Sequence, residues 1–137
     1  MPHNSVPTPS RPVSPHLQVW RWHITMLGSI LHRVTGSALY AGAFVIAAWL
    51  VALMLGREAY TAFLTLAASP LGILVWIAFS FAAFIHLAGG LRHLMWDMGQ
   101  GFDPKVANNL TVISLLFSVA ATVILWTGLF VSGTVTL

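Results

Sequence analysis

The chain has 137 residues, of which 58% are hydrophobic and only 7% are charged, with six Lys and Arg against three Asp and Glu. A soluble domain carries about 25% charged residues, so most of this surface cannot face water and lipid must be its solvent. The absence of cysteine excludes disulfides, thiolate metal sites and iron–sulfur ligation, and the basic residues are too few and too scattered for a nucleic-acid interface.

The first 27 residues form a proline-rich arm. Proline at this density forbids a continuous helix, so we expect an extended conformation. A secretory signal would need an apolar run of about 7–15 residues near the start, whereas the first apolar run here begins later and is longer. We therefore expect the arm to be retained. Its prolines are Pro2, Pro7, Pro9, Pro12 and Pro15.

Residues 28–137 form the predicted transmembrane domain. Each of its three apolar stretches exceeds the roughly 20 residues that cross the hydrocarbon layer of a bilayer. Gly56 ends the first stretch, and Pro70 marks the start of the second rather than its middle. We predict an all-α membrane protein, an up-down bundle of three helices packed against a second membrane-anchor subunit. The predicted spans are 29–55, 65–95 and 107–131.

Positive charge is concentrated on one side of the predicted membrane. The N-terminal arm and the loop after the second span lie on that side, and Arg57 is the only basic residue on the other. The positive-inside rule therefore predicts a cytoplasmic N-terminus. We place the chain in a bacterial inner membrane in preference to the mitochondrial inner membrane, where a matrix-facing N-terminus would give the same pattern. The basic residues on the N-terminal side are Arg11, Arg21, Arg33, Arg92 and Lys105.

His86 is an ionisable residue deep in the second span. At 1.5 Å per residue it lies about 9 Å deeper than Arg92. Small neighbours on its helix would leave a shallow groove where a flat macrocycle could lie while the imidazole reaches its iron. Close helix packing, with His86 hydrogen-bonded across helices, explains the same pattern. A bis-histidine site would need a histidine from another chain. The small neighbours are Ala82, Ala83, Gly89 and Gly90.

Donor groups cluster at the edge of the first span. Ser29 and Arg33 are four residues apart on one helical face, with His32 adjacent. A hydroxyl and a guanidinium could hold the oxygens of a quinone head or a haem propionate, and an arginine reaching lipid phosphate is the simpler interpretation.

His93 lies seven residues after His86, on roughly the same face of the predicted helix. Because it is next to Arg92 and one turn from Asp97, we expect it at the membrane interface. There, His93 and Arg92 would pair with Asp97 or with lipid phosphate, which makes His93 the weaker ligand candidate.

Three segments together resemble the signature of the succinate dehydrogenase cytochrome b subunits, the membrane anchors of succinate:quinone oxidoreductase. They span most of the chain in the family's order, and the departures are small: Trp20 stands where tyrosine is usual, and the arm before Arg11 is longer than needed. Neither departure involves a haem or quinone residue. The segments are RPVSPHL at 11–17, SILHRVTG at 29–36 and HLAGGLRHLMWD at 86–97.

This resemblance implies a subunit of a four-subunit enzyme, respiratory complex II. A flavoprotein subunit would oxidise succinate, an iron–sulfur subunit would relay electrons, and two membrane anchors would share haem b and a quinone site. By position in the motif, His86 would be an axial haem ligand opposed by a histidine of the second anchor, and His32 with Arg33 would approach the haem propionates. Ser29 and Arg33 would line the quinone site, and Asp97 would help deliver protons. The isolated chain would catalyse nothing.

Three other functions are compatible with parts of the pattern. A fumarate reductase anchor would share the same architecture, and a structural anchor would bind lipid without haem. A small transporter or channel usually places carboxylates along its pathway, whereas Glu58, Asp97 and Asp103 all lie in predicted loops or at the interface.

Overall fold

A computed structural model describes residues 21–135, which contain four helices and no strand. The N-terminal motif at 11–17 lies outside these residues. The helices are α1 (Ile24–Leu55), α2 (Arg57–Ala67), α3 (Pro70–Asp97) and α4 (Pro104–Val131).

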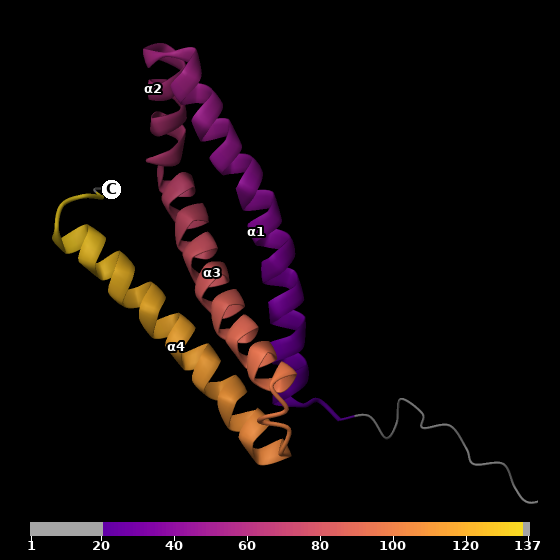
Figure 1. Ribbon diagram of the computed structural model, residues 1–137. Coiled ribbons are helices and arrows are strands. Elements are labelled where there is room, and N and C mark those ends of the chain that lie inside the picture. The colour runs from indigo at the N-terminus through magenta and orange to yellow at the C-terminus, as the bar shows by residue number, and fades with distance from the viewer. Residues whose placement is uncertain (1–20, 136–137) are drawn as a thin grey trace, which may run out of the picture.

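The three long helices run up, down and up (Figure 1). The start of α1, the end of α3 and the start of α4 meet at one end of the bundle, and α2 lies at the other end. By length and composition α1, α3 and α4 can each cross a membrane. The prediction of an all-α membrane protein with three such helices is confirmed.

The ends of the helices differ from the predicted spans for local reasons. Helix α1 begins at Ile24, so residues 24–27 belong to the helix and not to the arm. The second span begins at Pro70 and not at residue 65, because Ser69 caps α3 by accepting a hydrogen bond from the amide of Gly72. In α4, Asp103 caps the first turn by accepting from the amides of Lys105 and Val106 at 2.9 and 3.2 Å.

The short helix α2 was not predicted. Gly56, at φ +99°, turns the chain after α1, and residues 57–67 then form a separate helix. A side chain at Gly72 would meet the backbone carbonyls of Leu66 and Ala67 at the break between α2 and α3. The glycine therefore allows the two helices to follow each other closely.

The interior of the bundle is narrow and partly polar. Its buried apolar residues are few, and most large apolar side chains face outward, as expected of helices solvated by lipid. On α4, buried hydroxyls donate to carbonyls four residues earlier within the helix, so their small side chains satisfy themselves and allow close packing. These α4 residues are Thr111, Ser118 and Thr122.

Candidate functional site

Three histidines come together where α1 packs against α3. The imidazoles of His32 and His86 are stacked, with centroids 4.0 Å apart and planes 5° from parallel. The ring of His93 lies 4.9 Å from that of His32, tilted by 50°. His32 and His93 were both expected at the membrane edge, and no contact of either with His86 was predicted. The fold brings all three into one cluster, because residues 86 and 93 share a face of α3 that contacts α1.

His86 also contacts the backbone and a hydroxyl of α1. Its Nδ1 lies 3.1 Å from the carbonyl oxygen of His32 and 3.4 Å from Oγ1 of Thr35. A Cβ atom at Gly36 would lie 3.0 Å from Cε1 of His86, so glycine makes room for the ring. Neither Thr35 nor Gly36 was predicted as a site residue, although both belong to the segment SILHRVTG.

The four small residues around His86 serve two different surfaces. Ala82 and Gly89 are buried, and a Cβ at Gly89 would lie 2.6 Å from Nδ1 of His32. Ala83 is exposed, and a Cβ at Gly90 would meet nothing within 4 Å. One side of His86 is therefore packed on α1, and the other side leaves an open strip on α3. Ala82 and Gly89 therefore take part in helix packing, and a groove for a flat macrocycle beside Ala83 and Gly90 stays a prediction.

Arg92 faces the interior of the bundle, and its expected pairing with Asp97 or lipid phosphate is wrong. Only 4% of Arg92 is exposed, and its guanidinium donates a 2.6 Å hydrogen bond to Oγ1 of Thr111 on α4. A Cβ at Gly28 of α1 would lie 2.8 Å from the same guanidinium nitrogen, and Trp96 lies under the cation at 5.1 Å. Arg92 thus connects the three long helices at one level of the bundle, while Asp97 is exposed at the end of α3.

The predicted quinone residues lie near the start of α1. Ser29 is half-buried and Arg33 is exposed. They share this end of the bundle with the last turn of α3, which carries Asp97 (Figure 1). Arg33 therefore lies on the outer surface of the described part of the bundle.

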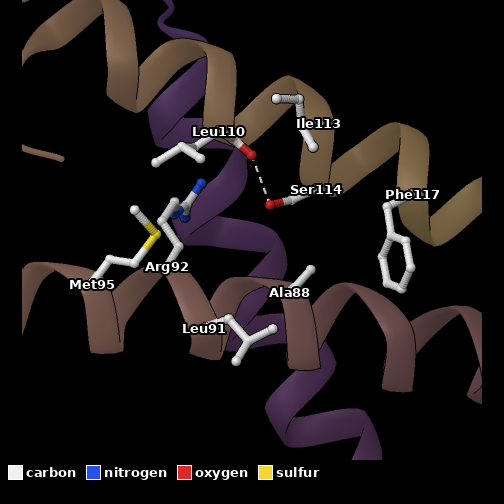
Figure 2. Close-up of a pocket in the computed structure, with 8 residues that line it drawn as sticks. All are labelled: Ala88, Leu91, Arg92, Met95, Leu110, Ile113, Ser114 and Phe117. Atoms are coloured by element: carbon white, nitrogen blue, oxygen red, sulfur yellow. Dashed lines mark hydrogen bonds between the residues drawn. The ribbon is translucent and has the colours of Figure 1, made fainter.

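A groove of about 250 Å³ lies between α3 and α4, lined mostly by apolar side chains such as Leu91, Ile113 and Phe117 (Figure 2). Arg92 contributes to its lining, and the hydroxyl of Ser114 donates to the carbonyl of Leu110 at 2.7 Å. Within residues 21–135, no group of three or more His, Cys, Asp or Glu residues is arranged to hold a metal ion.

Comparisons with known proteins agree over most of the chain. Residues 7–125 match the model of the family described as "Succinate dehydrogenase/Fumarate reductase transmembrane subunit". The chain is 36% identical over 116 residues to the succinate dehydrogenase cytochrome b556 subunit of Rickettsia felis, covering 85% of this chain and 90% of that protein.

Two further relatives come from another bacterium and from a mammal. The cytochrome b556 subunit of Paracoccus denitrificans is 36% identical over 115 residues, 84% of this chain and 88% of the relative. The mitochondrial cytochrome b560 subunit of Sus scrofa is 34% identical over 118 residues, 83% of this chain and 69% of the relative.

Proposed function

Since this chain belongs to the family of succinate dehydrogenase and fumarate reductase transmembrane subunits, we propose that it provides an axial ligand to haem b and part of a quinone-reduction site. The family resemblance inferred from the sequence is thereby confirmed. The observation that carries the proposal is the position of His86, which is packed on α1 on one side and borders an open strip on the other.

The residues around His86 fit a haem. Imidazole is the usual axial ligand of haem b, and beside His86 the exposed Ala83 carries only a methyl group and Gly90 carries no side chain, so a flat ring could approach the helix at these two positions. His32 and Arg33 are the residues of this chain that would hold the propionates. When bound, the haem supplies a one-electron carrier within the membrane.

The second axial ligand would come from another subunit. The lone pair of an imidazole nitrogen lies in the plane of the ring. The rings of His32 and His86 are nearly parallel and 4.0 Å apart, so their lone pairs lie in two separate planes. These lone pairs cannot point at the same iron atom. This geometry supports a second membrane anchor that presents its own histidine to the open side of His86.

A quinone site at the start of α1 would use the donors found there. The exposed guanidinium of Arg33 and the hydroxyl of Ser29 can donate hydrogen bonds to quinone oxygens. Reduction of a quinone consumes protons, and the exposed carboxylate of Asp97 at the same end would pass them from water. No proton would then need to cross the bilayer.

The proposed setting is a bacterial inner membrane with the N-terminus in the cytoplasm. Arg33 and Lys105 both lie at the end of the bundle where α1 and α4 begin, as the positive-inside rule requires. An iron–sulfur subunit would dock at this end and connect to a flavoprotein that oxidises succinate. In a fumarate reductase the same kind of anchor would pass electrons in the opposite direction, from quinol to the soluble subunits. The relatives above are all named as succinate dehydrogenase subunits, which favours the succinate-oxidising direction.

Haem ligation is tested by purifying the complex through this chain and recording reduced-minus-oxidised spectra. His86→Leu should lose or shift a b-type band, whereas the matched variant His93→Leu should keep it. An unchanged band in His86→Leu would remove His86 as the ligand, and the absence of a band in the wild-type complex would leave a haem-free structural anchor.

The quinone site is tested by comparing two activities of the complex. Arg33→Ala and Ser29→Ala should lower quinone reduction and spare succinate oxidation by an artificial acceptor dye. Arg57→Ala, which changes an exposed arginine at the opposite end of the bundle, is the matched control. An equal loss of both activities in the Arg33 and Ser29 variants would contradict a quinone role.

A further inference from the structure

The Nδ1 atom of His86 faces two oxygen atoms of α1. The nearer is the backbone carbonyl oxygen of His32 at 3.1 Å, and the other is Oγ1 of Thr35 at 3.4 Å. Thr35 is 6% exposed, so its hydroxyl is held away from lipid and water. In an apolar setting, the contact of a ring nitrogen with two oxygens is favourable only if one of the atoms supplies a proton to it. The question is therefore whether the proton belongs to the nitrogen or to an oxygen.

Both oxygens act as acceptors toward this nitrogen. A carbonyl oxygen has no proton to give. The proton of Thr35 is directed to the backbone, because Oγ1 lies 2.6 Å from the carbonyl oxygen of Leu31 and 3.2 Å from that of His32. The lone pairs of the Thr35 hydroxyl therefore remain for His86. A lone pair on Nδ1 would face oxygen lone pairs, which is unfavourable.

We infer that Thr35, acting with the carbonyl of His32, is a positioning residue that holds His86 with its proton on Nδ1 and its lone pair on Nε2. This inference rests on the proposed haem ligation by His86. A neutral imidazole carries one N–H and one lone pair, so fixing the proton on one nitrogen selects the other as the ligand atom. Stacking on His32 and the close approach of Gly36 fix the plane of the same ring.

The contact also has an electronic consequence. An N–H group that donates to an oxygen makes its imidazole a more basic ligand, and a more basic ligand favours the oxidised metal. Removal of one of the two acceptors should weaken this effect. The haem midpoint potential should therefore rise when the Thr35 hydroxyl is removed.

The test compares Thr35→Val with Thr35→Ser in the purified complex. Valine keeps the shape of the side chain and removes the oxygen, whereas serine keeps the oxygen. We expect Thr35→Val to retain haem with a higher midpoint potential and a shifted low-spin ferric signal in electron paramagnetic resonance, and Thr35→Ser to restore both. Thr122→Val is the matched control, since Thr122 is 7% exposed and donates to the carbonyl four residues earlier, on α4.

The outcomes separate this inference from the proposal on which it rests. If His86→Leu loses the haem band while Thr35→Val matches the wild type in potential and spectrum, only the positioning role is overturned. If His86→Leu keeps the band, haem ligation and the positioning role both fail. Should Thr35→Val not assemble, Thr35→Ala removes the oxygen without adding bulk, and failure of both variants would assign Thr35 to packing and overturn the inference.

Discussion

Replacing Thr111 by valine should destabilise the bundle by removing the hydrogen-bond acceptor of Arg92. Thr111 is 1% exposed and Arg92 is 4% exposed, so water cannot replace the lost oxygen easily. Valine has nearly the shape of threonine, and it leaves no cavity of consequence. The change therefore isolates the 2.6 Å bond between Arg92 and Thr111 from packing.

The expected loss in the free energy of unfolding is about 1.5 kcal/mol. Hydrogen bonds to charged groups are worth roughly 1.5–3 kcal/mol, whereas interhelical hydrogen bonds in membranes average about 0.6 and reach about 1.7 kcal/mol. The charge on Arg92, the short distance and the burial place this bond at the upper end of the membrane range.

Thr122→Val provides the reference for this measurement. Thr111 and Thr122 both donate to a carbonyl four residues earlier on α4, and only Thr111 accepts from a cation. Subtracting the loss for Thr122→Val from the loss for Thr111→Val therefore removes the contribution of the intrahelical bond and leaves that of the bond to Arg92. We expect Thr122→Val to cost less than about 0.5 kcal/mol, since a single intrahelical contact of this kind adds little to helix stability.

The stability of this subunit can be measured in the purified complex by titration with SDS and pulse proteolysis. A double-mutant cycle with Arg92→Met assigns the loss to the pair, because the Thr111→Val penalty should fall to that of Thr122→Val when the guanidinium is absent. Equal losses in Thr111→Val and Thr122→Val, or a coupling below about 0.5 kcal/mol, would refute the reasoning.

Three further changes test other contacts by the same titration. Asp103→Ala should cost about 1 kcal/mol through loss of the α4 cap, and Asp103→Asn much less; equal costs would exclude capping as the cause. Gly89→Ala should displace the ring of His32, whose Nδ1 would lie 2.6 Å from the new Cβ, and lower stability; an unchanged midpoint would contradict the close packing. Trp126→Phe should cost about 1 kcal/mol or more by removing the 3.2 Å bond to Ser80, a loss that Ser80→Ala should share.

Composition and local signals were sufficient for the class of the protein and the number of membrane helices. So few charges in a chain with long apolar runs leave lipid as the only suitable solvent. Pro70 was correctly placed at the start of a helix, because proline fits the first turn and disrupts later ones. The short helix α2 was missed because Gly56 and the charged residues after it were interpreted as a loop.

The partners of the site residues depended on tertiary structure. In a soluble helix, apolar periodicity marks the face that turns inward, but a membrane helix is apolar toward both lipid and its neighbours. The sequence alone therefore could not indicate that Arg92 faces Thr111 rather than the interface, or that His32 stacks on His86. His86 and its small neighbours were evident from the sequence, because an ionisable residue and glycines stand out in an apolar helix. The contact between Thr35 and His86 joins positions 51 residues apart, and only the packing of α1 on α3 brings them together.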